Sequence, residues 1–320
     1  MSKSLQSQAD SFELDARRSR SVGLLLFDLD DTIVQAGSYV SQRVLHALEQ
    51  ARAAGYVLSV ASGRALCSVH KEVLKNGVMD YAVCANGSTV TRLEDGKVLC
   101  HQPLSQRDCL ECHKMLLPYG AAWNAFLEDM ALFEWKGASY MLTGRTGALA
   151  RTKRYDAGRK NALRGMARTM RRGMRYVRLS LTNKGHRQVR SVLPYLKRAE
   201  GGVDKMGCTI PSPSHCQEAA RLLLRDGRFE VVRMGQTELE ITARGVTKGT
   251  GVRKLMDYLN MNADDTVAFG DGANDLPMAS AVGRFVAMGN AEDAVKAQAD
   301  SVCPSVAEDG VAVWIEQQLL

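Results

Sequence analysis

Long apolar stretches are missing from this chain of 320 residues. A membrane-spanning helix needs about 18 or more consecutive apolar residues, and no such window occurs, so we expect no membrane anchor. Residues 1–20 are polar and mixed in charge, and they show no basic stretch followed by an apolar one, as a signal peptide would. We therefore expect a disordered tail over 1–20 and a cytoplasmic protein.

Aromatic residues are also scarce, at 6% of the chain, whereas basic residues are concentrated. Between Gly144 and Ala199 there are 17 Lys or Arg and one acid, Asp156, so most of the net charge of +7 comes from this segment. Basic side chains of this kind usually cover solvated helix faces, and the alternative is attraction of an anionic partner. The few tyrosines nearby are widely spaced, which does not suit stacking on single-stranded nucleic acid. Nucleic-acid binding is therefore not expected.

The eight cysteines are scattered and several lie in apolar runs. This pattern predicts buried free thiols in a reducing compartment. Cys109, Cys112 and His113 match the spacing of a c-type haem attachment site, and they could also bind zinc. With no export signal and no second ligand pair downstream, we expect neither.

An apolar strand that ends in acids is the strongest signal for chemistry. Leu24 to Phe27 predict a strand buried on both faces, and Asp28 and Asp30 follow with side chains on the same side of an extended backbone. Because burying unpaired charge is costly, a divalent cation such as Mg²⁺ is a fitting partner. One carboxylate could attack phosphorus and the other carry a proton. The alternative is a strand followed by an Asp-rich turn.

The same pattern recurs near the other end of the chain. Thr266 to Gly270 predict a second buried strand, which ends at Asp271, and an apolar helical pattern starts at Leu276. In open α/β sheets, ligands bind at the carboxyl ends of the strands. The sequence therefore predicts one metal site built from both chain ends.

Two further segments predict a phosphate pocket. The strand Val57–Ala61 ends in Ser62, which we expect at the start of a helix, where a hydroxyl and free N–H groups favour an anion. Lys248 falls in the first turn of another predicted helix, where it opposes the helix dipole, and neutralising a phosphate would explain it. A capping serine and a solvated lysine are the alternatives.

Taken together, four motifs resemble those of the haloacid dehalogenase-like phosphohydrolases, and their order and spacing are most similar to Cof-type members of subfamily IIB. The motifs are Asp28-x-Asp30-x-Thr32, Ser62-Gly63-Arg64, Lys248-Gly249 and Gly270-Asp271-Gly272-x-Asn274-Asp275. Asn86-Gly87 and Glu308 to Ala312 add to the likeness, which extends over residues 22–320. Four motifs in order are far more specific than any one of them.

The resemblance implies a role for each motif residue. Asp28 would be the nucleophile that forms an aspartyl-phosphate, and Asp30 the general acid and then the general base. Mg²⁺ would be held by Asp28, the Asp30 backbone carbonyl and Asp271. Asp275 would orient the metal site from behind. The residues implied to bind phosphate are Thr32, Ser62, Gly63, Lys248 and Asn274, and the candidate substrate contacts are Arg64 and Asn86.

The fold that follows is a doubly wound, Rossmann-like parallel-sheet core with an inserted α+β cap. We place the core at residues 21–87 and 244–320 and the IIB-type cap at 88–243, with hinges near 86–89 and 243–246. The elements predicted in the cap are helices at 105–117, 157–172, 185–199 and 214–225, and strands at 122–127, 131–135, 176–181, near Cys208, 229–234 and 238–242.

These observations predict a Mg²⁺-dependent phosphatase of small phosphorylated metabolites, such as sugar phosphates and nucleotide or cofactor-type phosphates. A dedicated sugar-phosphate phosphatase or a phosphomutase of the same subfamily is the nearest alternative. A basic regulatory protein that binds RNA or a protein partner through the cap is a more distant one. The oligomeric state cannot be read from the sequence.

Overall fold

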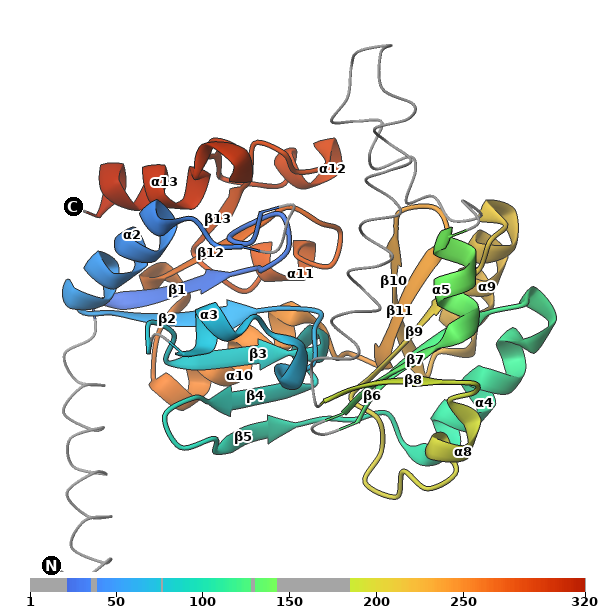
Figure 1. The fold of residues 1–320 in the computed structure, drawn as a ribbon. Coiled ribbons are helices and arrows are strands. Elements are labelled where there is room, and N and C mark those ends of the chain that lie inside the picture. Colours follow the sequence, from blue (N-terminus) through green and yellow to red (C-terminus); the bar gives the residue numbers. More distant parts are fainter. Residues whose placement is uncertain (1–21, 36–38, 76, 128–129, 143–184, 320) are drawn as a thin grey trace, which may run out of the picture.

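Two separate β-sheets organise the protein, for which the computed structural model describes residues 22–35, 39–75, 77–127, 130–142 and 185–319 (Figure 1). In spatial order, the first sheet contains β14 (Ser301–Val302), β13 (Arg284–Ala287), β12 (Thr266–Gly270), β1 (Gly23–Phe27), β2 (Tyr56–Ala61), β3 (Tyr81–Cys84), β4 (Thr89–Arg92) and β5 (Val98–His101). The six strands from β14 to β3 are parallel to one another. Strand β4 pairs antiparallel with β3 on one side and with β5 on the other.

Helices cover both faces of this sheet. The helices that follow or precede its strands are α2 (Gln42–Ala53), α3 (Lys71–Lys75), α10 (Lys248–Leu259), α11 (Leu276–Ala279), α12 (Asp293–Lys296) and α13 (Gly310–Gln318). Helices α2 and α13 pack together on one face, and α10 and α11 pack together on the other (Figure 1). Strand β1 is buried along its whole length, as its unbroken apolar sequence predicts for a parallel strand covered on both faces. The predicted doubly wound core is confirmed.

The second sheet is antiparallel apart from one parallel pair, β7 with β8. In spatial order it contains β10 (Phe229–Met234), β11 (Glu238–Ala243), β9 (Lys205–Thr209), β6 (Ala122–Leu127), β7 (Met130–Glu134) and β8 (His186–Val189). Its helices are α4 (Gln106–Leu116), α5 (Trp135–Leu142), α8 (Leu193–Leu196) and α9 (Pro213–Asp226). Its hydrophobic core is separate from that of the first sheet. We call this part the cap.

Short 3₁₀ helices complete the described elements. They are η1 (Leu66–Ser68), η2 (Ala85–Gly87), η3 (Leu117–Tyr119), η4 (Ala263–Asp265) and η5 (Val306–Glu308). No helix in the described part of the chain is long and apolar enough to cross a bilayer.

The predicted start of the cap at residue 88 does not agree with the strand pairing. Strands β4 and β5 form an antiparallel hairpin that continues the first sheet from β3, with Tyr81 opposite Arg92 and Cys84 opposite Thr89. The chain therefore leaves the first sheet after His101, and the hinge predicted at 86–89 lies inside that sheet. Residues 88–101 were placed in the cap and no strand was predicted there, because two short β-strands carry no sign of which sheet they join.

The cap elements agree with the sequence in part. The predicted helix 185–199 is wrong, because residues 186–189 form β8 beside β7 and only Leu193–Leu196 are helical. Pro194 lies in the first turn of that short helix, as proline prefers. Four predicted regions lie outside the described residues. They are the helix 157–172, the strand 176–181, the tail 1–20 and most of the basic segment 144–199.

Candidate active site

The carboxyl ends of three parallel strands bring the predicted motifs together. Strand β1 lies between β2 and β12, and the register pairs Phe27 with Val60 on one side and with Phe269 on the other. The residues just beyond these ends therefore meet at one edge of the sheet. Helix α10 begins at the same edge, capped by Thr247, whose hydroxyl accepts from the Thr250 amide at 3.1 Å.

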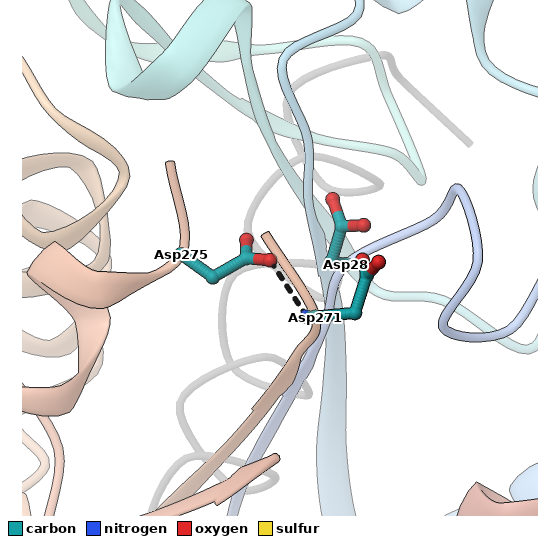
Figure 2. A group of neighbouring side chains, drawn as sticks. All are labelled: Asp28, Asp271 and Asp275. Atoms are coloured by element: carbon teal, nitrogen blue, oxygen red, sulfur yellow. Dashed lines mark hydrogen bonds between the residues drawn. The ribbon is translucent and has the colours of Figure 1, made fainter. Parts of the chain in front are cut away.

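Three carboxylates converge at this edge. One oxygen from each of Asp28, Asp271 and Asp275 lies within 4.8 Å of the others (Figure 2). Asp275 is fully engaged, because its Oδ2 accepts from the Asp271 and Gly272 amides, both at 2.9 Å, and its Oδ1 accepts from Lys248. It shapes the turn that carries Asp271 and leaves Asp28 and Asp271 facing each other (Figure 2).

Because burial disfavours the ionised form of these carboxylates, a nearby positive charge is needed to stabilise it. Desolvation raises the pKa of Asp28 to about 7, opposed by Lys248 and helped by the charge of Asp275. Desolvation, together with the charges of Asp28 and Asp275, raises the pKa of Asp271 to about 9. A cation with oxygen preference would offset both effects, and the cluster, in the described residues, contains no His or Cys. The donor set fits Mg²⁺.

Lys248 is the positive partner already in place. Its side chain is fully buried, and its Nζ donates to Asp28 Oδ1 at 2.5 Å and to Asp275 Oδ1 at 2.6 Å. Desolvation lowers the pKa of Lys248, but the two carboxylates outweigh it, and the pKa rises above its ordinary value. Lys248, which opposes the dipole of α10, therefore stays charged. A charged side chain is what its predicted role in neutralising a phosphate requires.

Asp30 lies at the outer side of the cluster and is held by arginine. Arg64 donates to both Asp30 oxygens, at 2.7 Å each, and to the Ser68 carbonyl. Burial alone would raise the pKa of Asp30, but the hydrogen bonds and charge of Arg64 outweigh this, and the pKa is lowered. The resemblance makes Arg64 a substrate contact, whereas its present partner is the predicted acid–base residue.

The other predicted phosphate contacts surround the same edge. Thr32 is buried, and its hydroxyl has no hydrogen-bond partner among the described residues, as a donor that awaits a phosphoryl or carboxylate oxygen would. Ser62 is buried too, but the expectation of a helix start there is wrong. Its amide donates to the Val83 carbonyl at 2.8 Å, and the next helical turn, η1, begins only at Leu66.

Two cap residues at this edge were not predicted. Lys205, which is buried, forms an ion pair at 2.5 Å with the half-buried Glu240, and Glu240 also accepts from Asn86 at 2.8 Å. Glycine at 63 leaves room for them, because a Cβ there would lie 3.2 Å from the Lys205 ammonium. The alternation of polar and apolar residues along β11 was the available signal, but it marks any sheet with one exposed face.

The alternative metal site in the cap is not formed. Cys109 and Cys112 are buried, and the His113 ring stacks on Trp123 with centroids 5.3 Å apart. Across the ranges that the structure describes, the aspartates are the one group whose ligand atoms are close enough for a metal. All eight cysteines are free, as predicted.

Comparison with known proteins identifies the family. The sequence pattern of the haloacid dehalogenase-like hydrolases matches residues 25–315. The pyridoxal phosphate phosphatase YbhA of Escherichia coli is 24% identical over 93% of this chain and 98% of its own length. Phosphatase YwpJ of Bacillus subtilis is 25% identical over 92% of this chain and 99% of its own length. The chain spans 54% of a longer Streptococcus pyogenes relative, which is 24% identical and is named for a phosphatase and a peptidyl-prolyl isomerase activity.

Solved structures agree on the fold. A haloacid dehalogenase-like hydrolase from B. subtilis superposes with a TM-score of 0.77 at 23% identity, over 93% of this chain and 100% of that one. The subclass IIB sugar phosphatase BT4131 superposes with a TM-score of 0.69 at 20% identity, over 92% and 98%. The chain belongs to the haloacid dehalogenase-like hydrolases. Within that family it is a phosphatase with the fold of subclass IIB, as predicted.

We expect Mg²⁺ to raise the unfolding temperature, and to raise it more at pH 8.5 than at pH 6. The raised pKa values of Asp28 and Asp271 mean that the folded protein binds more protons than the unfolded chain between their ordinary value of 3.8 and about 9. The free energy of unfolding therefore falls as pH rises through this window, and Mg²⁺ offsets the buried negative charge once the carboxyls deprotonate. Thermal melts with EDTA or excess Mg²⁺ measure the difference.

The matched control for these melts is Asp271→Asn, which removes one carboxylate from the cluster and should remove most of the Mg²⁺-induced shift. A shift that is equal at both pH values, or larger at pH 6, would contradict the assignment of these carboxylates as the cation site.

Proposed function

We propose that the protein hydrolyses small phosphorylated metabolites through an aspartyl-phosphate on Asp28, with Mg²⁺ held by Asp28, the Asp30 backbone carbonyl and Asp271. One observation carries the proposal: a buried carboxylate at the end of β1 is hydrogen-bonded to a buried lysine and lies within 4.8 Å of a second strand-end carboxylate. The substrate classes are sugar phosphates and nucleotide or cofactor-type phosphates. The names of relatives that act on pyridoxal phosphate and on sugars support this range.

The reaction runs in two halves on the protein's own residues. An Asp28 oxygen attacks phosphorus, the ester P–O bond breaks, and Asp30 donates a proton to the leaving oxygen. Asp30 then takes a proton from water, the water oxygen attacks phosphorus, and the bond from phosphorus to Asp28 breaks. Orthophosphate leaves and the Asp28 carboxylate is restored. Mg²⁺, when bound, supplies positive charge to the phosphoryl oxygens.

Lys248 and the buried hydroxyls supply the rest of the charge stabilisation. Phosphoryl transfer depends mainly on positioning and on electrostatic stabilisation of the transferred group. Lys248 is fixed by Asp275, so its charge needs no reorganisation when Asp28 becomes an acyl phosphate. The Thr32 and Ser62 hydroxyls, both buried at the same edge, are the donors to the phosphoryl oxygens in this proposal.

The ion pair between Arg64 and Asp30 affects the first half-reaction. Asp30 must carry a proton to protonate the leaving oxygen, yet the Arg64 pair lowers its pKa. A substrate phosphoryl group competes for the same guanidinium, and drawing it away lets Asp30 take up a proton. In this proposal Arg64 is therefore a substrate contact. A cytoplasmic location and the absence of a nucleic-acid partner remain predictions from the sequence.

A panel of phosphate esters tests the proposal. Sugar phosphates, nucleoside monophosphates and cofactor phosphates are each incubated with enzyme and Mg²⁺, and orthophosphate release is measured. We expect release from at least one class, loss of release with EDTA and recovery with added Mg²⁺. Isomerised sugar phosphate without orthophosphate would indicate a mutase instead. No release from any ester would contradict the proposed function.

A further inference from the structure

One carboxylate of the cap joins the two sheets above the active site. Glu240 lies on β11, where Leu239 and Ile241 point into the cap core, so its side chain projects from the opposite face. Its Oε2 accepts from Asn86 Nδ2 at 2.8 Å, and its Oε1 accepts from Lys205 Nζ at 2.5 Å. Asn86 belongs to η2 of the first sheet, and Lys205 belongs to the cap.

Lys205 keeps this carboxylate ionised. Lys205 is 2% exposed, and its ammonium lies 4.8 Å from the centre of the Phe126 ring. Burial raises the pKa of Glu240, but the charge and hydrogen bond of Lys205 outweigh this, with Asn86 contributing, and the pKa is lowered. A carboxylate with a charged lysine on one oxygen is an acceptor only, because it carries no proton to donate.

An acceptor on this side fixes the orientation of the Asn86 amide. The NH₂ group of Asn86 must face Glu240, so its carbonyl Oδ1 faces the other way, toward Asn274 Nδ2 at 3.4 Å. Asn274 is buried in the turn between Asp271 and Asp275. Asn86 also has a positive φ of 56°, which lies in the left-handed region that asparagine adopts more readily than most residues. Its amide is therefore held in one orientation between the cap and the metal-site turn.

We propose that Glu240 is a positioning residue of the active site, which acts through Asn86 to orient Asn274. When the cap lies against the first sheet, Glu240 and Asn86 then fix which side-chain atoms of Asn274 face the phosphoryl group. This inference rests on the proposed function, and it adds that the phosphoryl site is complete only with the cap in place.

Glu240→Gln tests the relay, because glutamine has only one acceptor oxygen for two donors. We expect E240Q and N86A each to lower kcat roughly tenfold, since displaced groups behind an active site typically cost this much. Because both act through one contact, the double variant N86A/E240Q should be no worse than either single variant. E240D keeps two acceptors and should recover part of the loss. Calorimetry of orthophosphate binding with Mg²⁺ should show weaker binding in E240Q.

The matched control is Asp108→Asn, which removes a carboxylate from another cap ion pair, Asp108 with Arg228, away from the site. It should leave kcat within twofold of the wild type. Where E240Q fails to fold, K205M/E240L replaces the ion pair by apolar groups and should show the same loss of activity. A folded E240Q with wild-type turnover and orthophosphate affinity, or losses that multiply in N86A/E240Q, would overturn the proposal. A wild-type enzyme that binds orthophosphate but hydrolyses no ester contradicts only the proposed function, because orthophosphate binding still tests Glu240.

Discussion

Asp28→Asn should reduce turnover by roughly a thousandfold or more while substrate still binds, since loss of a nucleophile typically costs at least this much. The amide keeps the shape of the side chain and its place beside Lys248, 2.5 Å away in the wild type, but it removes the attacking anion. The protein should remain folded, because the change removes a buried charge whose desolvation raises its pKa. Steady-state kinetics on the best ester, with substrate affinity from calorimetry, give both quantities.

Chemical trapping makes this prediction specific to the covalent route. A beryllofluoride adduct, or a borohydride-reduced acyl phosphate identified by mass spectrometry, should map to Asp28 in the wild type and be absent in Asp28→Asn. The exposed Asp264→Asn is the matched control and should retain full turnover. A label on another residue, or full activity in Asp28→Asn, would refute attack by Asp28.

Lys248→Met should be the most destabilising single change at the site. It leaves two buried carboxylates, Asp28 and Asp275, without their cation, and breaking a buried pair in this way costs about 3–5 kcal/mol. The loss should grow with pH, since Lys248 lowers the pKa of Asp28 and its removal raises that pKa further. Below that pKa the carboxyl is neutral and costs little to bury. Turnover should fall at least a hundredfold, as for other groups that stabilise developing charge.

Urea unfolding at pH 6 and pH 8.5 measures this effect, in EDTA so that Mg²⁺ does not take the place of the lysine. Lys254→Met removes the same charge from an exposed position of the same helix and should change neither stability nor turnover appreciably. Equal destabilisation by the two variants would show that Lys248 acts only through the net charge of α10.

The active-site edge could be predicted from the sequence because its signals are local. An apolar run followed at once by acids identifies the end of a buried parallel strand, and the register of β1 with β2 and β12 places those ends together. Lys248 was recognisable because a lysine is unfavourable in the first turn of a helix and so needs a partner. The hydrogen-bond partners of the site residues could not be predicted. Arg64 donates to Asp30 from a loop, and hydrophobic periodicity gives no information about the path of a loop.

The cap was harder to predict for a physical reason. Whether a short strand joins one sheet or another depends on contacts with distant residues, so residues 88–101, which form the β4–β5 hairpin of the first sheet, were placed in the cap. Residues 186–189 were predicted to belong to a helix, and it is the pairing with β7 that makes them a strand. The role of Glu240 depends on its hydrogen bond with Asn86, which lies 154 positions away in the sequence, and Lys205 takes part only through its ion pair with Glu240.

Because β1 pairs with β12, one edge of β1 stays without its partner strand during much of protein synthesis. Leu24 lies opposite Thr266, so the strand that covers one edge of β1 leaves the ribosome 242 residues after β1 itself. At about 5–20 residues per second, that edge waits roughly 12 to 50 seconds for its partner. The whole cap is made in that interval and has a hydrophobic core of its own on which to fold. The apolar strand that precedes Asp28 is thus made well before the strand that covers one of its edges, and until then that edge is open to pairing with another chain.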